Sequence, residues 1–455
     1  MVKRRLREVI RMVGGAWTGT PEELDRWVSG VSTDTRTLTP GALFVPLVGT
    51  RFDGHQFVRE ALGRGASAFL WQRDRGVPPG SAIVVEDTLA ALQRLARAYR
   101  RELGARVIGV TGSNGKTTTK DLIAAVLAQR YRVHKTQGNL NNHIGLPLTL
   151  LSAPADTEVV VCEMGMSGRG EIACLSRIAE PQLAVITTIG EAHLAQLGSR
   201  EAIAEAKLEI VEGLDADGTL FLDGDEPLLD LAAERFAGTI SRCGFGPRCQ
   251  WRAQDVAFRG LDGMTFRVGN EPYAVPIPGR HNVKNALYAV AVGRTLGLAP
   301  EEIRRGLAGA TITGMRTERV RGIGGATVLN DAYNASPTSV RASLELLAAL
   351  PFARRVAVLG DMLELGPEEE ALHRDVGRAI DPARIHWLVT VGKRARWIAE
   401  EAAEAGFPAA RIRCTETPDE AADAVLPLTG ADTVILVKAS RGMALEAIVR
   451  RLTAE

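Results

Sequence analysis

Short apolar runs alternate with amphipathic helical patterns along the middle of the chain. Residues 107–110, 159–161, 183–186 and 220–222 are such runs, and segments with apolar residues three and four positions apart separate them. Continuous apolar runs between helices are typical of parallel strands that are covered on both faces. We therefore predict a central α/β unit with a parallel sheet.

The flanking segments have different patterns. Residues 31–85 combine short apolar runs with turns, and residues 88–103 form a helical pattern. Residues 251–278 alternate apolar and polar positions, with Asp-Gly and Gly-Asn turns, which predicts an antiparallel appendage. After residue 314 strands and helices alternate again, as in a doubly wound, Rossmann-like unit.

A chain of 455 residues is too long for one compact core. We predict an α/β fold class with three domains. These are a small α/β domain (1–85), a central P-loop domain with a parallel sheet (86–314) and a C-terminal Rossmann-like domain (315–455).

Charge and hydropathy argue against several classes of protein. The 55 basic and 54 acidic residues nearly cancel, so no global field favours nucleic acid or an anionic membrane. Apolar residues near the N-terminus (Leu6, Val9, Ile10, Val13) have helical spacing interrupted by charges, unlike a signal peptide, and no apolar run is long enough to span a bilayer. Five cysteines without metal-site pairing fit a reducing compartment. We expect a cytoplasmic protein without membrane insertion or nucleic-acid binding, and a monomer.

Lysine is rare in this sequence, since only eight of the 55 basic residues are lysine. Four of them, Lys116, Lys207, Lys284 and Lys438, lie in or beside the segments that carry candidate chemistry. An ammonium group can lose its proton and become a nucleophile, whereas a guanidinium group stays charged.

A glycine-containing loop between a strand and a helix is the clearest candidate site. Residues 111–119 read Thr-Gly-Ser-Asn-Gly-Lys-Thr-Thr-Thr, although Val110 stands where the commonest P-loop has its first glycine. Backbone N–H groups of such a loop and the positive end of the following helix attract phosphate. Lys116 is predicted to reach the β- and γ-phosphates and Thr117 to offer its hydroxyl to magnesium. The alternative is a tight turn with a surface lysine. The predicted phosphate-binding residues are Gly112, Ser113, Asn114, Gly115, Lys116, Thr117 and Thr118.

Three further side chains are candidates for metal binding or catalysis. Glu163 follows one apolar run and His193 the next, so both are expected at the carboxyl edge of the sheet, where a carboxylate can hold magnesium. A lone loop histidine is more often a surface residue. Lys207 lies in a helical stretch, where spacing alone favours a solvated lysine with i,i+4 partners.

Together these segments resemble the Mur ligase family, ATP-dependent amide-forming enzymes of peptidoglycan precursor synthesis, over nearly the whole chain. The resemblance implies that the glycine loop, Glu163, His193 in Ala-His-Leu and Lys207 in Ala-Lys form one site. It also implies ATP and Mg²⁺, with two ions, as cofactors and a carbamylated Lys207 as a metal ligand. Lys116, Lys207 and His193 are then the implied catalytic residues.

Other motifs extend the likeness. Residues 279–286, Gly-Arg-His-Asn-Val-Lys-Asn-Ala, resemble the segment near the adenine, with Asn282 as the implied contact. Arg316 and Asp331 resemble residues that close the third domain onto ATP. Taken singly, each could be an ordinary cap or turn.

Within the family, motifs at 32–36, 51–55, 136–147 and 331–334 resemble the branch that adds a dipeptide. The implied partners are UDP-N-acetylmuramoyl-tripeptide, whose UDP end binds the first domain, and D-alanyl-D-alanine. The Asp-Asn-Pro-Arg motif of the diaminoacid-adding branch is absent. The implied substrate-binding residues are Ser32, Asp34, Arg36, Arg51, Asn139, Asn142, Tyr333 and Asn334.

Three alternatives stay open at this point: the diaminoacid-adding branch, a folylpolyglutamate synthase-like ligase and a P-loop nucleotide switch. The sequence departs from the family at Ala195, where an acid is frequent, and at Ala439, where glycine is usual. Whether the tripeptide ends in lysine or diaminopimelate is also open.

Overall fold

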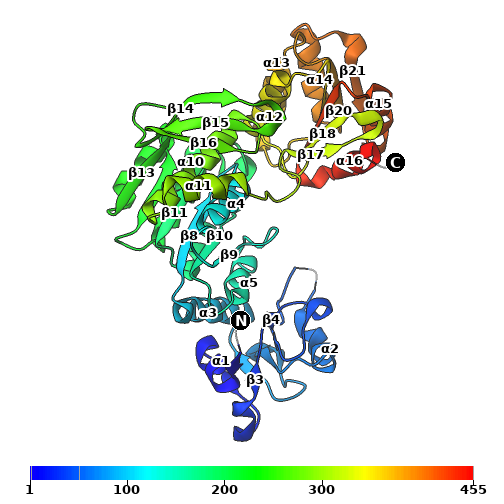
Figure 1. Ribbon diagram of the computed structural model, residues 1–455. Coiled ribbons are helices and arrows are strands. Elements are labelled where there is room, and N and C mark those ends of the chain that lie inside the picture. Colours follow the sequence, from blue (N-terminus) through cyan, green and yellow to red (C-terminus); the bar gives the residue numbers. More distant parts are fainter. Residues whose placement is uncertain (2, 51, 454–455) are drawn as a thin grey trace.

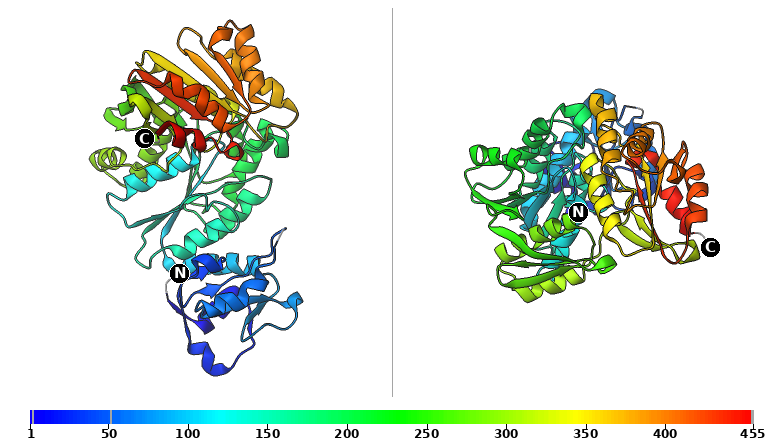
Figure 2. Two further views of the ribbon diagram at one scale, coloured as in Figure 1. Left: turned by 90° about the vertical axis from the view of Figure 1, so that its right-hand side faces the viewer. Right: turned by 90° about the horizontal axis from the view of Figure 1, so that it is seen from above.

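The computed structural model describes residues 1, 3–50 and 52–453. Three large sheets with their helices follow one another along the molecule, with the sheet of the N-terminal unit at one end and that of the C-terminal unit at the other (Figure 1; Figure 2). The predicted domain boundaries fall between these sheets, and their positions stay a prediction. None of the helices in the described ranges has both the length and the apolar character needed to cross a bilayer.

The first unit is built on a five-stranded sheet in the order β2-β7-β6-β5-β4. Helix α1 (Leu6–Val13) buries Leu6, Val9 and Val13, as its spacing predicted. The other elements are β1 (Arg4–Arg5), β2 (Ala16–Trp17), β3 (Trp27–Val28), β4 (Val31–Ser32), β5 (Leu43–Phe44), α2 (Val58–Gly63), β6 (Ala68–Gln72) and β7 (Ile83–Val85), and β1 pairs with β3 in a separate two-stranded sheet.

Helix α3 (Thr88–Leu103) leads from this unit into the central one, with the bounds that the sequence predicted. Asp87 precedes it, and the Asp87 side chain accepts a hydrogen bond from the backbone N–H of Ala90 at 2.9 Å. Gly104 ends the helix in a left-handed conformation.

The substitution Asp87→Ala should lower the free energy of unfolding by about 1 kcal/mol, because it removes the acceptor that caps α3. Thermal or urea unfolding would measure the change. The effect should be confined to stability, since Asp87 lies outside the main cavity described below. An unchanged unfolding midpoint would contradict this role.

The central sheet has nine strands in the order β16-β15-β14-β13-β12-β11-β8-β10-β9. The strands from β9 to β13 pair in parallel, and β14 to β16 form the antiparallel appendage that the sequence predicted. The strands are β8 (Arg106–Thr111), β9 (Val133–Lys135), β10 (Val159–Glu163), β11 (Leu183–Ile186), β12 (Thr219–Asp223), β13 (Thr239–Gly244), β14 (Trp251–Phe258), β15 (Met264–Val268) and β16 (Glu271–Val275).

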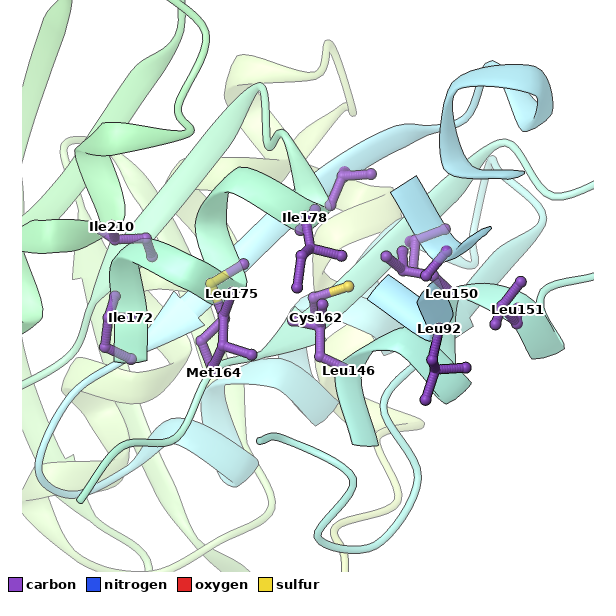
Figure 3. Close-up of a cluster of buried hydrophobic side chains, with 14 of the residues drawn as sticks. Leu92, Leu146, Leu150, Leu151, Cys162, Met164, Ile172, Leu175, Ile178 and Ile210 are labelled. Carbon is purple, nitrogen blue, oxygen red and sulfur yellow. The ribbon is translucent and has the colours of Figure 1, made fainter. Parts of the chain in front are cut away.

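Helices cover both faces of this sheet. Successive strand residues point to opposite sides, so the apolar runs make both faces apolar, and each face packs against helices. Val107 packs on one face with a cluster that includes Leu92, Leu146 and Cys162 (Figure 3). Ile108 packs on the other face against α4 and α10. The helices of this unit are α4 (Lys116–Leu127), α5 (Gly145–Ser152), α6 (Glu171–Ala179), α7 (Leu194–Leu197), α8 (Arg200–Leu208), α9 (Ala232–Arg235), α10 (Arg280–Thr295) and α11 (Pro300–Ala308).

The third unit has a six-stranded sheet in the order β17-β18-β22-β19-β20-β21. It is parallel apart from the edge strand β17, and helices flank both faces, which agrees with the predicted doubly wound architecture. Its elements are β17 (Glu318–Arg321), β18 (Thr327–Asn330), α12 (Pro337–Ala349), β19 (Arg354–Gly360), α13 (Glu369–Arg378), β20 (Trp387–Val391), α14 (Ala395–Glu404), β21 (Ile412–Thr415), α15 (Pro418–Val425), β22 (Thr433–Lys438) and α16 (Glu446–Thr453).

Candidate functional site

A cavity of about 820 Å³ lies between the carboxyl edge of the central sheet and the third unit. It is lined by the glycine loop, by the segments after β10 and β11, by the start of α10 and by the first turns of α12. The predicted residues that line it are Ser113, Asn114, Gly115, Lys116, Thr117, Thr118, Asn142, Glu163, His193, Asn282, Arg316, Asp331, Tyr333 and Asn334. The fold therefore brings most of the predicted site into one place.

The glycine loop owes its shape to two glycines. A Cβ on Gly112, at φ +144°, would lie 1.9 Å from Oγ1 of Thr187, and a Cβ on Gly115, at φ +80°, would lie 2.5 Å from Oδ1 of Asn285. The loop is held in turn by a hydrogen bond from the backbone N–H of Ser113 to the Thr188 carbonyl at 2.8 Å. Such a close approach leaves room for backbone alone.

Lys116 begins helix α4 and folds back over this loop. Its Nζ donates to the carbonyl oxygen of Gly112 at 2.8 Å. Burial lowers the pKa of Lys116, the Glu163 carboxylate opposes this shift, and Arg316 lowers the pKa further. Nζ of Lys116 thus lies among backbone carbonyl groups, at the place where phosphate oxygens are predicted.

Glu163 ends β10 as a buried side chain with one free oxygen. Its Oε1 accepts a hydrogen bond from Nδ2 of Asn141 at 2.8 Å, whereas its buried Oε2 has no partner. A buried carboxylate oxygen without a donor is costly unless a cation joins it. This acceptor is the feature that best fits a magnesium ion beside the phosphates.

His193 caps the short helix α7 in a left-handed conformation, at φ +65°. Its Nδ1 lies 2.7 Å from Oε2 of Glu364 in the third unit, without the alignment of a hydrogen bond. Burial lowers the pKa of His193, and the Glu364 carboxylate opposes that shift. A neutral imidazole at this edge is suited to metal binding.

Lys207 is buried in α8, with 2% of its surface exposed, which contradicts the solvated lysine that spacing alone favoured. Burial lowers the pKa of its amine well below the usual value, and the positive charge of Lys116 lowers it further. No carboxylate forms an ion pair with Lys207 in the part of the chain that the structure describes. The side chain does not line the main cavity directly.

The unmodified side chains do not make a metal centre by themselves. Across the described ranges, no three His, Cys, Asp or Glu side chains are grouped closely enough to hold a metal ion. A metal ion held by Glu163 and His193 would therefore need further oxygen ligands, such as the Thr117 hydroxyl, a phosphate or a carbamate on Lys207.

At the start of α10, Asn282 belongs to a buried amide network. Its Nδ2 donates to the Pro278 carbonyl at 2.8 Å, and its Oδ1 accepts from Nδ2 of Asn285 at 2.9 Å. Asn285 in turn accepts from Oγ1 of Thr119 at 3.2 Å. The network ties the segment around Asn282 to helix α4 and hence to the glycine loop.

An acidic pair beside this segment was missed by sequence reasoning. Lys284 Nζ lies 2.8 Å from Asp223 and 3.2 Å from Asp225, and Asp225 also accepts from the backbone N–H of Phe245. All four residues line the cavity. The Asp-Gly-Asp sequence directly after the predicted strand at 220–222 was the signal that could have revealed them.

Two predicted residues of the third unit have defined contacts. Nη2 of Arg316 donates to Oγ1 of Thr117 at 3.3 Å, and its guanidinium lies 4.0 Å from the centre of the Tyr333 ring. Asp331 is paired with Lys438 at 2.6 Å and accepts from Oγ of Ser343 at 2.8 Å. Arg316 thus reaches Thr117 at the end of the glycine loop, and Asp331 forms contacts within its own unit.

Several predicted substrate residues lie elsewhere or have local contacts. Asn142 Oδ1 accepts a hydrogen bond from the backbone N–H of Gly145, the first residue of α5, at 2.8 Å. In the first unit, Asp34 pairs with Arg36 at 2.6 Å, and hydrogen bonds from Arg36 lower the pKa of Asp34 to about 2. Of all the predicted site residues, those that do not line the main cavity are Ser32, Asp34, Arg36, Asn139, Gly112 and Lys207. Arg51 lies outside the described residues.

Comparisons with known proteins decide the family. Models of the Mur ligase family match three parts of the chain: the catalytic domain over residues 28–100, the middle domain over 110–293 and the glutamate ligase domain over 315–441. The chain belongs to the Mur ligase family.

Relatives of this Mur ligase match it over nearly its whole length. The UDP-N-acetylmuramoyl-tripeptide–D-alanyl-D-alanine ligase of Bacillus subtilis is 48% identical over 99% of both chains. A crystal structure of MurF from Acinetobacter baumannii has a TM-score of 0.89 at 28% identity and covers 99% of this chain and 98% of its own. MurF from Thermotoga maritima, solved in complex with ADP, has a TM-score of 0.82 at 29% identity, with 93% and 96% covered. These likenesses agree with the three-domain α/β fold class predicted from the sequence.

Proposed function

We propose that this Mur ligase joins D-alanyl-D-alanine to UDP-N-acetylmuramoyl-tripeptide, with conversion of ATP to ADP and phosphate. The full-length similarity to the Bacillus subtilis ligase is the observation that carries this proposal. The cavity between the phosphate loop and the third unit supports it, because it gathers nucleotide, metal and substrate candidates in one space. We place the enzyme in the cytoplasm as a monomer.

Magnesium fits the residues around Glu163. The free Oε2 of Glu163, the His193 imidazole and the Thr117 hydroxyl would hold the ions, and a carbamate on Lys207 would complete the set. Burial and the lowered pKa of Lys207 favour the neutral amine that carbamate formation requires, which arginine could not supply. Bound magnesium supplies positive charge that neutralises phosphate oxygens and orients the reacting groups.

The proposed reaction has two steps, transfer of the γ-phosphoryl group and formation of the amide. The terminal carboxylate of the tripeptide attacks the γ-phosphorus, which gives an acyl phosphate and ADP. Lys116 and the N–H groups of residues 112–118 balance the charge on the transferred phosphoryl group. The amine of D-alanyl-D-alanine then attacks the acyl carbon, and phosphate leaves as the amide forms.

The three domains have separate tasks in this scheme. The first domain holds the UDP end of the donor through the segments around Ser32, Asp34, Arg36 and Arg51, with Asn139 and Asn142 nearer the tripeptide. Asn282 contacts the adenine. The third domain brings Arg316 and Asp331 to ATP and presents the acceptor near Tyr333 and Asn334. Closure of this domain excludes water, which would hydrolyse the acyl phosphate.

Phosphate release by the purified protein tests the assignment. With ATP, magnesium and UDP-N-acetylmuramoyl-tripeptide, we expect turnover with D-alanyl-D-alanine and none with single amino acids. Donors that end in lysine and in diaminopimelate would be compared in the same assay. Turnover with a diaminoacid on a dipeptide donor, or with glutamate on a folate, would instead support another ligase of the superfamily. ATP hydrolysis that needs neither a donor nor an amine would favour a nucleotide switch.

A further inference from the structure

Glu191 joins the central domain to the third domain across the cavity. It lies in the loop after β11, two residues before the metal candidate His193, and only 8% of its surface is exposed. Its carboxylate accepts hydrogen bonds from Oγ1 of Thr338 at 2.8 Å and from the Thr338 backbone N–H at 3.2 Å. Thr338 belongs to the first turn of α12 in the third domain.

The partners of Glu191 all come from the other domain. Besides Thr338, its carboxylate lies 3.8 Å from Nη2 of Arg341, which is also on α12. Among the described residues, no side chain or backbone N–H of the central domain donates to this carboxylate. With the third domain moved away, Glu191 would therefore exchange these partners for water.

The geometry is that of a helix cap built across a domain boundary. The first N–H groups of a helix lack partners within the helix, and the N-terminal end of the helix carries partial positive charge. Glu191 accepts from one of these N–H groups, that of Thr338, and places a carboxylate at the N-terminal end of α12, a helix whose first turns line the cavity. A buried carboxylate with charge-assisted hydrogen bonds is a stronger contact than an exposed ion pair.

Other contacts between the two domains lie near Glu191 and involve the glycine loop. Oγ of Ser336, the residue before α12, donates to Oδ1 of Asn114 in the phosphate loop at 3.3 Å. Arg316 reaches Thr117 in the same arrangement. These contacts between the two domains are polar, and domains that meet through polar contacts usually move relative to one another.

We propose that Glu191 is a positioning residue that latches the third domain onto the ATP site by capping α12. Glu191 does not act on the reacting atoms. It stabilises the closed arrangement, in which Arg316 and the start of α12 cover the phosphate loop. The link to amide formation rests on the proposed function, whereas the latch itself requires only closure on nucleotide.

Removal of the carboxylate should shift the protein toward the open arrangement. For Glu191→Ala we expect kcat to fall about tenfold, the range of one charged hydrogen bond, and the KM for ATP to rise, because nucleotide binding and closure are coupled. Because closure excludes water, the amount of ADP formed per amide product should also rise. Glu191→Gln keeps one acceptor oxygen and should give intermediate values for both quantities.

A double-mutant cycle separates the latch from a general loss of stability. Thr338→Val removes the hydroxyl partner, and adding it to Glu191→Ala should cause no further loss. Asp87→Ala is the matched control, since it removes a helix-capping carboxylate within one unit and should leave the ADP-to-product ratio unchanged. If Glu191→Ala does not fold, Glu191→Gln and Thr338→Val still carry the test.

Closure can be measured without the ligase reaction. Energy transfer between a dye on the exposed Cys414 and one on Asp217→Cys would report the distance between the domains, with and without a non-hydrolysable ATP analogue and magnesium. We expect the analogue to close the wild type fully and Glu191→Ala only in part. Equal closure of both proteins, or independent effects of Glu191→Ala and Thr338→Val, would overturn the proposal. A wild type that closes but forms no amide would count against the proposed function instead.

Discussion

Replacing Lys207 with alanine is expected to lower ligase turnover by about a thousandfold, because a metal ligand would be lost and charge stabilisation by a metal is worth several kcal/mol. Lys207→Ala also leaves a space beside the site, since the lysine side chain is almost fully buried. Short carboxylic acids such as acetate should enter that space, supply the missing oxygen ligand and restore part of the activity. Steady-state ADP release with increasing acid would measure this rescue.

Two comparison variants test whether the effect is due to loss of a carbamate on Lys207. Lys207→Arg keeps a positive charge but cannot form a carbamate, so it should be inactive and should not respond to acid. Lys393→Ala removes an exposed lysine of the third unit and should behave as the wild type. Full activity of Lys207→Ala without added acid would refute the carbamate.

Substitution of Lys116 by methionine should lower kcat by about a hundredfold to a thousandfold, the usual cost of losing one donor that balances developing charge. The Lys116 side chain is long enough to reach across the glycine loop, since its Nζ contacts the Gly112 carbonyl oxygen at 2.8 Å. Binding of ADP should weaken much less than kcat falls, because the β- and γ-phosphates gain most from Lys116 during transfer. Calorimetry for ADP and steady-state kinetics for turnover would measure the two effects.

Lys116→Arg is the conservative comparison for this prediction. A guanidinium group is larger than an ammonium group and has a fixed planar shape, so it should not restore turnover in the space beside the loop. A rise in KM with an unchanged kcat would show that Lys116 contributes only to ground-state binding and would contradict the proposed role.

The pattern of the sequence predicted the buried elements well. Helix α3 has the predicted bounds, and the runs around residues 107, 159, 183 and 220 are all strands of the central sheet. These segments are covered on both faces, so burial imposes a strong apolar signal. Exposed edge strands carry a weaker signal, and β17 (Glu318–Arg321) and β21 (Ile412–Thr415) were missed for that reason.

Local motifs predicted much of the candidate site but not its electrostatics. The glycine loop could be predicted because strand, glycines, lysine and helix are adjacent in the chain. The surroundings of Lys207 could not, because its burial depends on packing of α8 against segments remote in sequence. The ion pairs of Asp223 and Asp225 could not be predicted for the same reason, since their partner Lys284 lies on α10, far along the chain.

The sequence by itself determined the three α/β units, the glycine loop and the side chains at the strand ends, since these follow from local periodicity and neighbouring residues. Only the tertiary structure decided how the third unit meets the glycine loop. The contacts of Glu191 with Thr338 and of Arg316 with Thr117 join residues that are far apart in the chain. Each partner alone is an ordinary polar residue, and its role arises only when folding brings two domains together and removes water from between them.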